Sequence, residues 1–470
     1  MSVPVISIAQ MREWETITWA TGQTEAEVIR RVGIQVAQIA RHLTRSGDTI
    51  LLLAGKGHNG DDVRAASEHL QERDAILLEV ASPQADFSKL ESALARRPAL
   101  IIDGLFGIGL NRPLDVAWVK FIKRINQAQL RVLSVDVPSG LNADTGETHG
   151  AAIEATVTLT IGAPKPGMLR HTAWPYVGRL EVATEIGLAA CPLGGALQWT
   201  LPGDFLGFPP QRPMAGHKGN FGHLAIIAGS MGYHGAAVLA ARGAQRAQPG
   251  LVTLFTQSPV FHPVAAQLQS VMVKPWQRAD RLPGAFSAIL IGPGLAAPDL
   301  PEEIETTVRQ LWQESPHPII VDASALDWLP PEATPQTGLR VVTPHPGEAA
   351  RLLKISTPEV QVNRLKALRE LSRSFGDCWV VLKGHQTLIG RSEGDVFVNS
   401  SGNPHLAQGG SGDVLAGLLA GLLAQPALLT DPGRTLRYGV WQHGAAADAL
   451  QAARGNWIVE ELAEQLGNVR

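Results

Sequence analysis

Two successive series of alternating strands and helices predict that this chain is an α/β protein with two domains. Apolar runs of strand length recur along it, for example at residues 49–54 and 223–228, with helical patterns between them. A segment rich in proline and glycine, residues 191–213, separates the two series. At 470 residues the chain is also longer than one hydrophobic core normally supports. We therefore expect two three-layer α/β/α domains, residues 1–200 and 201–470, each built on a mostly parallel sheet.

The N-terminal domain is expected to place polar side chains at the carboxyl ends of its strands, where open parallel sheets bind ligands. In chain order the expected elements are helix 26–43, strand 49–54, helix 63–71, strand 75–80, helix 87–95, strand 99–103, helix 116–127, and strands 131–136 and 157–161. The polar residues after these strands are Asn59, Asp62, Asp103, Asn111, Asp136 and Ser139. Each alone is typical of a turn or helix cap, but the convergent set predicts a site.

The C-terminal domain restarts the same alternation after residue 213. The expected elements are strand 223–228, helix 236–248, strands 251–256 and 288–292, helix 300–314, strands 319–322, 341–343 and 379–383, helix 414–424, and a last helix over 436–453. Strand ends here carry Asp322, His345, Glu348 and Lys383. A lone histidine is usually structural, and a lysine at such a place is commonly a surface residue.

A glycine-rich stretch at residues 409–412 leads through Asp413 into an apolar helix. Glycine backbone can close around an anion, and a helix N-terminus adds free N–H donors and partial positive charge. The stretch therefore predicts an anion site, most often one for phosphate. A carboxylate beside a phosphate needs a proton to take or a metal between them, which makes Asp413 a candidate general base. The alternative is that Asp413 merely caps a buried helix.

Composition argues against several classes of protein. The formal net charge is −3 and no polybasic run occurs, so neither a nucleic-acid nor a membrane-surface partner is expected. The longest apolar run, residues 414–424, is far shorter than the ~20 residues that span a bilayer. No signal peptide is expected, and Cys191 and Cys378 stand in no metal-like spacing. We expect a protein of a reducing compartment, the cytoplasm.

Five motifs of the second half, in order, resemble one family. They are HKGNFGHLAIIAGS at 217–230, YHGAAVLAA at 233–241, TPHPGE at 343–348, LKG at 382–384, and GNP at 402–404 with GGSGD at 409–413. This half resembles the ADP-dependent NAD(P)H-hydrate dehydratases of the ribokinase-like superfamily. The first half is similar to their fusion partner, the NAD(P)H-hydrate epimerase domain, which has a Rossmann-like fold. The resemblance to these bifunctional repair enzymes covers about residues 10–465.

The resemblance implies a phosphorylation followed by an elimination. Water added across the C5=C6 bond of NADH or NADPH gives a hydrate, NADHX or NADPHX, and hydroxide is a poor leaving group. Phosphorylation by ADP or ATP with Mg²⁺ turns the hydroxyl into a phosphate that can depart. Asp413 would be the base, and Ala236, Gly294 and His345 would contact the hydrate. The residues implied for nucleotide binding are Lys383, Gly384, His385, Gln386, Thr387, Gly410, Ser411 and Gly412.

For the first half the resemblance implies that the R and S hydrates are interconverted, with Asp136 as a catalytic residue. Asn59, Asp103 and Ser139 match the family's K⁺ ligands. The implied substrate contacts are His58, Asn59, Gly60, Asp62, Gly107, Ile108, Gly109, Leu110, Asn111, Arg112 and Pro113. The expected partners are the hydrates themselves and further copies of the chain in a homo-oligomer.

Some positions depart from the family. In the C-terminal half Ser411 stands where threonine is usual and keeps the hydroxyl, while His405 and Gln408 change the surroundings of the loop. In the N-terminal half the usual run of Asn-Asn-Gly-Gly-Asp-Gly is replaced by residues 58–63, HNGDDV. Two glycines are thereby lost, and valine at residue 63 tolerates positive φ poorly. The alternative function is therefore a ribokinase-like small-molecule kinase whose first half is a non-catalytic binding or oligomerisation module.

Overall fold

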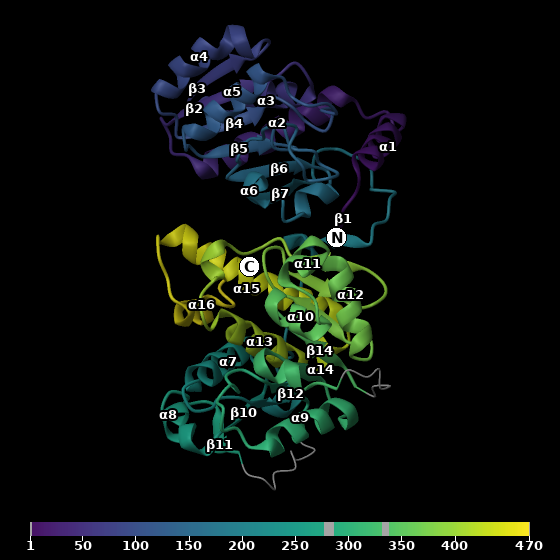
Figure 1. The fold of residues 1–470 in the computed structure, drawn as a ribbon, viewed down its shortest axis with the longest axis vertical. Helices are drawn as coiled ribbons and strands as arrows, with labels where there is room; N and C mark the ends of the chain where they lie inside the picture. Colours follow the sequence, from purple (N-terminus) through teal and green to yellow (C-terminus); the bar gives the residue numbers. More distant parts are fainter. Residues whose placement is uncertain (1, 277–285, 331–337, 470) are drawn as a thin grey trace. The chain divides into compact units, whose positions relative to one another are not determined.

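The structure, a computed structural model, describes residues 2–276, 286–330 and 338–469. The chain divides into two compact units, Val3–Trp199 and Thr200–Arg470, which are described separately (Figure 1). No helix within the described residues is long and apolar enough to cross a membrane.

The N-terminal unit is built on a parallel sheet with the strand order β3-β2-β4-β5-β6-β7. Its strands are β2 (Thr49–Ala54), β3 (Asp74–Glu79), β4 (Leu100–Gly104), β5 (Val132–Val135), β6 (Val157–Ile161) and β7 (Arg179–Ala183). The short strands β1 (Val3–Pro4) and β8 (Leu197–Trp199) pair antiparallel with each other. The order reverses between β2 and β4, so the loops after these two strands flank the crevice where such sheets bind ligands.

Helices cover both faces of this sheet. They are α1 (Ile8–Ala20), α2 (Glu25–Leu43), α3 (His58–Ser67), α4 (Pro83–Ala95), α5 (Val116–Gln127) and α6 (Trp174–Val177). Successive side chains of β2 alternate between the faces: Ile50 and Leu52 pack with α2 and α3, whereas Leu51 and Leu53 pack with α4 and α5. The expected three-layer α/β/α architecture of the N-terminal half is confirmed.

The strands of the C-terminal unit follow the order β17-β16-β15-β14-β13-β12-β9-β10-β11. They are β9 (His223–Ile227), β10 (Leu251–Thr256), β11 (Met272–Pro275), β12 (Ala288–Ile291), β13 (Ile319–Val321), β14 (Arg340–Val342), β15 (Trp379–Leu382), β16 (Leu388–Gly390) and β17 (Val396–Val398). Pairing is parallel from β15 to β11, and β15, β16 and β17 pair antiparallel.

Helices of the C-terminal unit lie on both faces because the chain moves along the sheet in both directions. From β9 it passes through α7 to β10 on one side, and from β12 it passes through α9 to β13 on the other. Right-handed crossovers in opposite directions put their helices on opposite faces. The helices are α7 (His234–Ala247), α8 (Phe261–Ala265), α9 (Glu302–Glu314), α10 (Pro346–Leu353), α11 (Thr357–Val362), α12 (Arg364–Ser374), α13 (Ser411–Leu423), α14 (Pro426–Leu429), α15 (Pro432–Ala453) and α16 (Val459–Gln465).

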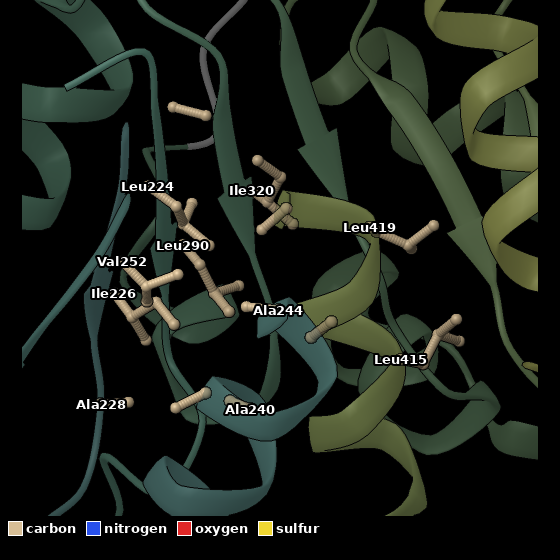
Figure 2. Close-up of a cluster of buried hydrophobic side chains, with 14 of the residues drawn as sticks. Leu224, Ile226, Ala228, Ala240, Ala244, Val252, Leu290, Ile320, Leu415 and Leu419 are labelled. Carbon is tan, nitrogen blue, oxygen red and sulfur yellow. The ribbon is translucent and has the colours of Figure 1, made fainter. Parts of the chain in front are cut away.

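The largest buried cluster of this unit joins the sheet to α7, α13 and α15. Figure 2 shows Leu224, Ile226 and Leu290 of the strands pointing toward Ala240 of α7 and Leu419 of α13. All five side chains are fully buried. Since α13 lies on α7 and on the sheet at once, its position is set from two directions.

Helices α7 and α13 pack in parallel at very short range. A Cβ on Gly243 would lie 2.1 Å from the Val414 carbonyl oxygen, and a Cβ on Gly417 would lie 1.9 Å from that of Ala240. Near one end Leu239 lies against Gly410. From the contact of Leu239 with Gly410 to that of Gly243 with Val414, the residue numbers increase along both helices. The two helices are therefore parallel, and their N-termini lie at the same end. Glycine is required at this interface because any side chain would push the helices apart.

Several predicted helix boundaries are wrong. Helix α13 begins at Ser411, not at Val414, so Asp413 lies inside its first turn and the cap is Gly410, with φ 98°. The capping alternative for Asp413 therefore fails. Helix α3 begins at His58, not at Val63, and α15 is followed by α16. In the first two cases glycine and polar residues were assigned to loops, although they also form the first turn of a helix.

The segment predicted to be a linker, residues 191–213, is partly built into the C-terminal unit. The Phe205 ring lies 5.5 Å from that of Tyr438 and 5.4 Å from that of Trp441, both on α15, and Phe208 also contacts Tyr438. Asp204 forms an ion pair with Arg437 of the same helix. Residues 200–208 are thus anchored by aromatic and ionic contacts.

We predict that replacing Gly417 by alanine lowers the free energy of unfolding by about 2 kcal/mol, because the added methyl group would overpack the interface between α7 and α13. Chemical denaturation measures this change. Gly235→Ala is the matched control, since it lies in α7 and a Cβ added there would meet nothing within 4 Å. Equal stabilities of the two variants would contradict the close packing.

Candidate active sites

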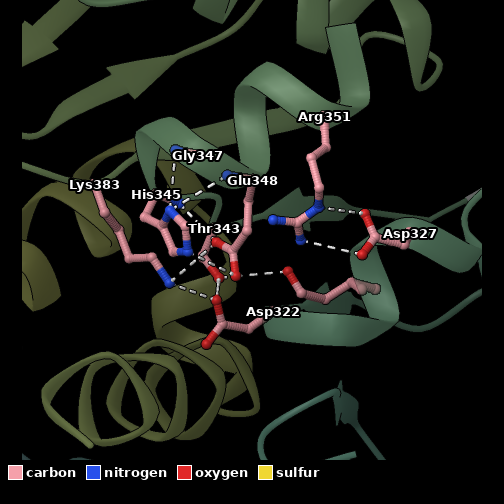
Figure 3. Close-up of polar contacts among 9 residues, drawn as sticks. Asp322, Asp327, Thr343, His345, Gly347, Glu348, Arg351 and Lys383 are labelled. Atoms are coloured by element: carbon pink, nitrogen blue, oxygen red, sulfur yellow. Dashed lines mark hydrogen bonds and ion pairs between the residues drawn. The ribbon is translucent and has the colours of Figure 1, made fainter. Parts of the chain in front are cut away.

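In the C-terminal unit, charged side chains from three strand ends meet at the first turn of α13. The Lys383 Nζ, just after β15, lies 2.7 Å from Oδ1 of Asp322, which follows β13 (Figure 3). It also lies 3.9 Å from Oε2 of Glu348. The Thr343 hydroxyl donates to the same Asp322 oxygen over 2.7 Å. A Cβ on Gly412 would be 3.5 Å from Lys383 Nζ, so the ammonium lies beside the glycine loop.

The HPGE motif after β14 forms a capping box at the start of α10. The backbone N–H of His345 donates to Glu348 Oε2 over 2.7 Å, and His345 Nδ1 accepts from the N–H of Gly347 over 3.0 Å (Figure 3). Because Nδ1 accepts, the ring proton is assigned to Nε2, which faces Glu348 Oε1 at 3.4 Å. The motif thus holds Glu348 in the cluster and leaves the His345 ring half exposed.

The charges of this cluster prepare Asp413 for proton transfer. Burial and, to a lesser extent, the nearby carboxylates of Asp322 and Glu348 together raise the pKa of Asp413 to about 7, against the opposing effect of Lys383. Burial lowers the pKa of Lys383, but Asp322 and Glu348 outweigh that effect and the net shift is upward. Lys383 therefore stays charged, while Asp413 exchanges a proton near neutral pH, as a general base should.

The glycine loop presents helix N–H groups beside this base. A Cβ on Gly410 would lie 2.5 Å from Leu239 Cδ1, and its φ of 98° also favours glycine. The first turn of a helix leaves N–H groups without an intrahelical acceptor. Because α7 and α13 begin at the same end, two partial positive charges lie side by side and favour an anion there.

The predicted nucleotide-binding residues 383–387 form a turn held by one arginine. Gly384 has φ 123° and Gln386 has φ 53°. The buried Arg364 donates to the carbonyls of Leu382 over 3.1 Å and Lys383 over 3.3 Å, and also to those of His385 and Gln386. The Thr387 hydroxyl donates to the Gly384 carbonyl over 3.1 Å. Burial lowers the pKa of Arg364 to about 10.

Arg364 was not among the residues predicted from the sequence. One signal was available: Arg364 stands at helical spacing with the apolar residues Ala367, Leu368 and Leu371, which form the buried side of α12. The role of residues 383–387 toward a nucleotide stays a prediction, and Arg364 explains how their backbone is shaped.

Two predicted substrate residues, Ala236 and Gly294, lie against each other. A Cβ on Gly294 would be 2.9 Å from Ala236 Cβ and 2.4 Å from the Tyr233 carbonyl oxygen. Ser230 donates to the Gly294 carbonyl over 2.6 Å and fixes this turn. Ala236 lies in the first turn of α7, at the same end as Asp413. The structure thus brings together the predicted substrate and base residues of the C-terminal half.

In the N-terminal unit the predicted K⁺ ligands converge around the backbone of Phe106. The Asp103 Oδ1 accepts from the Ser139 hydroxyl over 2.6 Å, and Oδ2 accepts from the Ser139 N–H over 2.9 Å. The Asn59 Nδ2 donates to the carbonyls of Phe106 over 3.2 Å and Val135 over 2.7 Å. Burial raises the pKa of Asp103.

The donor set fits a monovalent cation. It consists of one carboxylate with amide, hydroxyl and carbonyl oxygens, which are the ligands that K⁺ takes in proteins. A Cβ on Gly107 would be 2.2 Å from Asn59 Oδ1, so glycine is needed where the loop passes this amide.

Asp136 lies next to these ligands in an unusual backbone conformation, with φ 61°. Its Oδ1 accepts from the fully buried Lys165 Nζ over 2.5 Å and from the Ile161 N–H over 3.1 Å. Burial raises the pKa of Asp62 well above its usual value, and the charge of Asp136 raises it further. Within the described residues the Asp62 carboxyl has no hydrogen-bond partner, and its raised pKa favours the neutral form beside the ion-paired Asp136.

The loss of two family glycines does not strain the first turn of α3. None of residues 58–63 has positive φ. The expected conflict at Val63 is therefore wrong: this residue is fully buried within α3, where helical φ suits it. Gly60 is retained where it is needed, since its Cβ would lie 2.0 Å from the Gly55 carbonyl oxygen.

The remaining predicted contacts are more exposed. His58 Nδ1 lies 3.1 Å from Glu25 Oε1, and both side chains are exposed. Residues 107–110 form a turn closed by a hydrogen bond from the Leu110 N–H to the Gly107 carbonyl over 3.2 Å. Ile108 packs with the cluster around Met11, while Gly109, Asn111, Arg112 and Pro113 are exposed.

Comparison with known proteins places both units. The family described as NAD(P)H-hydrate dehydratase matches residues 224–467, and the family described as YjeF-related protein N-terminus matches residues 76–167. A bifunctional NAD(P)H-hydrate repair enzyme of Coxiella burnetii is 34% identical, with 93% of each chain covered. The chain belongs to the family of bifunctional NAD(P)H-hydrate repair enzymes. A repair enzyme of Gloeobacter violaceus is 31% identical over 95% of this chain and 94% of its own.

Solved structures agree for the dehydratase unit of this repair-enzyme family. An ADP/ATP-dependent NAD(P)H-hydrate dehydratase from Bacillus subtilis, co-crystallised with ATP/Mg²⁺, is 31% identical with a TM-score of 0.50. It is matched over 55% of this chain and 92% of its own. A ribokinase-like superfamily protein from Enterococcus faecalis is 26% identical, also with a TM-score of 0.50. The match covers 58% of this chain and 95% of that protein. The expected ribokinase-like fold of the C-terminal half is confirmed.

We predict that Lys383→Met lowers the free energy of unfolding by about 3 kcal/mol, because it leaves the buried Asp322 carboxylate without its cation. Adding Asp322→Asn should recover most of this loss. Denaturant titration of the wild type, both single variants and the double variant measures the coupling. Additive effects would show that the two side chains do not interact.

Proposed function

We propose that the C-terminal unit dehydrates the S hydrates of NADH and NADPH at the expense of ADP or ATP, and that the N-terminal unit interconverts their R and S forms. The observation that carries the proposal is Asp413, with a pKa of about 7, in the first turn of a helix whose N-terminus favours an anion. A base and a phosphate site at one point suit the phosphorylation of a hydroxyl.

The dehydration proceeds in two steps. The hydroxyl oxygen of the hydrate attacks the terminal phosphoryl group of the nucleotide, Asp413 takes the hydroxyl proton, and the bond to the bridging phosphate oxygen breaks, so that AMP leaves from ADP or ADP leaves from ATP. The C–O bond then breaks, inorganic phosphate leaves, and loss of a proton from the neighbouring carbon restores the ring double bond. Phosphate is a far better leaving group than hydroxide, which explains why a kinase fold can serve a lyase reaction.

The surrounding residues stabilise the transferring group. Lys383, held in place by Asp322, offers a fixed positive charge beside Gly412. The N–H groups of Gly410 and Gly412 lie at the helix start and can donate to phosphoryl oxygens, where charge accumulates, whereas the Ser411 N–H donates to the Gln408 carbonyl over 3.3 Å. These interactions supply electrostatic stabilisation without reorganisation.

A magnesium ion fits the same cluster. Within the described residues, the side-chain hydrogen bonds and ion pairs of Asp322 all use Oδ1, so Oδ2 is open. The part of the chain that the structure describes contains no group of three or more His, Cys, Asp or Glu side chains suited to a metal. Mg²⁺ with a nucleotide usually takes only one or two carboxylates, and Asp322 and Glu348 would hold it. When bound it would neutralise charge on the phosphates.

For the epimerase we propose Asp62 and Asp136 as the acid–base pair. Inverting the carbon that bears the hydroxyl requires its C–O bond to break and to form again on the other face. Asp62, whose raised pKa favours the protonated form, can give a proton to the leaving hydroxyl, and the Asp136 carboxylate, paired with Lys165, can receive one from the returning water. Asn59, Asp103 and Ser139 would hold K⁺ at the adjacent loop.

Two further properties belong to the proposal. We propose a homo-oligomer, as the family resemblance implies. We also propose the cytoplasm as the location, because both cysteines of the chain are free thiols, which suits a reducing compartment.

Supplied with S-NADHX and either ADP or ATP, the protein should regenerate NADH, measured by the return of dihydronicotinamide absorbance. Asp413→Asn should lower kcat by about 10²–10⁴-fold because the proton acceptor is removed. Nucleotide affinity, measured by calorimetry, should change little. A stable phosphorylated product without NADH would instead establish an ordinary small-molecule kinase.

The pH dependence gives an independent check on Asp413. Because its proton must be lost before it can act, kcat should rise with pH and reach half its maximum near pH 7. Because the pKa of Asp413 is raised in the folded state, protonated Asp413 contributes to the stability of the fold. This contribution to the free energy of unfolding is lost as pH rises from about 4 to about 7. At pH 8 Asp413→Asn should therefore be at least as stable as the wild type, which thermal denaturation tests.

The epimerase is tested with separated R-NADHX. Asp62→Asn should slow conversion of the R hydrate by about 10²-fold or more while turnover of the S hydrate stays unchanged, because the two activities use different units. An unchanged rate with the R hydrate would assign the N-terminal unit to binding or assembly.

A further inference from the structure

Helix α15 holds the segment of residues 402–411, which leads into the glycine loop of the dehydratase site, at both ends. At the start of the loop its Asp448 accepts the N–H of Gly402 over 2.9 Å and the Asn403 amide over 3.0 Å. At the end of the loop its His443 contacts Ser411, the first residue of α13. His443 and Asp448 both come from residues 443–448 of α15, a stretch that the motifs of the sequence did not include.

Close packing makes the first attachment rigid. The Ser401 hydroxyl donates to the Trp441 carbonyl over 2.7 Å. A Cβ on Gly444 would lie 2.3 Å from that hydroxyl oxygen and 2.8 Å from the Gly402 nitrogen. The loop backbone therefore runs directly over α15, and it begins from a fixed point.

The second attachment acts on one peptide group. The His443 side chain is 6% exposed, and its Nε2 lies 3.0 Å from the Ser411 carbonyl oxygen. A carbonyl can only accept, so Nε2 carries the proton and donates. Burial lowers the pKa of His443 to about 4, so the ring stays a neutral donor across the pH range of the reaction.

The peptide bond carries this constraint to the reacting group. The Ser411 carbonyl and the Gly412 N–H belong to one planar, trans peptide unit and point in opposite directions. Fixing the carbonyl on the α15 side therefore fixes the N–H on the other side. Lys383 Nζ lies near the same residue, 3.5 Å from the point that a Cβ on Gly412 would occupy.

We propose that His443 is a positioning residue of the dehydratase, which aims the Gly412 N–H at the transferring phosphoryl group through the shared peptide unit. The inference rests on the proposed function of the C-terminal unit and extends it to a side chain that contacts neither substrate nor nucleotide. The peptide unit lies in the first turn of α13, where the backbone has fewer intrahelical hydrogen bonds than the helix interior. His443 adds a restraint to this unit before the nucleotide binds.

The test compares His443→Leu with His443→Gln, since glutamine retains an N–H donor of similar reach. Leucine should lower kcat for S-NADHX by about 10²-fold, as expected for a lost oxyanion donor, with KM for the hydrate changed less than about threefold. Glutamine should restore kcat to within about tenfold of the wild type at an equal melting temperature. The midpoint of the pH profile should stay near that of the wild type, because Asp413 is untouched.

His223→Leu is the matched control. His223 is also a partly buried histidine with a lowered pKa, caused mainly by burial, and its Nε2 contacts Thr253 at 2.8 Å, away from the glycine loop. The His223→Leu variant should lose about as much stability as His443→Leu but should keep the kcat of the wild type. If His443→Leu keeps full kcat, or if kcat follows the melting temperature alike in the leucine, glutamine and control variants, the positioning role is overturned.

A second readout separates this inference from the proposed function. Calorimetric titration with ATP and Mg²⁺ needs no turnover, and His443→Leu should weaken that binding while His223→Leu should not. Unaltered ATP affinity together with unaltered kcat would overturn the role of His443. Absence of turnover by the wild type would refute the proposed dehydratase function. The effect of His443→Leu on ATP binding would still test whether His443 positions the glycine loop.

Discussion

The parallel packing of α7 against α13 is the constraint on which the dehydratase site depends. Glycines on both helices let the backbones approach so closely that Gly417 has no room for a Cβ. Two parallel helices repel each other at their N-termini, where each carries about half a positive charge. An anion at that end relieves the repulsion, so the packing that forms the core also favours phosphate binding at the helix N-termini. The sheet then delivers Asp322 and Lys383 to the same place, because the strands that they follow, β13 and β15, are both parallel neighbours of β14.

Much of the fold was predictable because strand and helix periods differ. Long buried strands such as β2 and β9 lie where apolar runs predicted them. The strands that were missed are short or lie toward sheet edges: β16 and β17 have three residues each, and β11 lies at the end of its sheet order. Such strands carry few apolar residues and are defined by their neighbours. Helix starts were missed for a related reason, since Gly60 and Gly412 suggest loops although both lie in first helical turns.

The candidate site was predictable where its residues act through local motifs, and not where they act across the chain. Asp413, Lys383 and His345 each belong to a short pattern with a physical meaning, and the structure brings all three to one end of the unit. Arg364 and His443 act on the backbone of segments 18 to 32 residues away. Nothing in helical periodicity distinguishes an inward-facing arginine or histidine that serves a loop from one that only fills space. That information resides in the tertiary arrangement.

The aromatic and ionic anchoring of residues 200–208 on α15 has a consequence for how the two halves can be separated. Phe205 and Asp204 behave as part of the second unit, since they complete the surface of the helix that also steadies the catalytic loop. A gene split in evolution, or a cut made by a protease, would preserve an intact second protein only if it fell before this segment. The boundary between the two units is therefore determined by the packing of a few side chains, and not by the proline-rich composition of this region of the sequence.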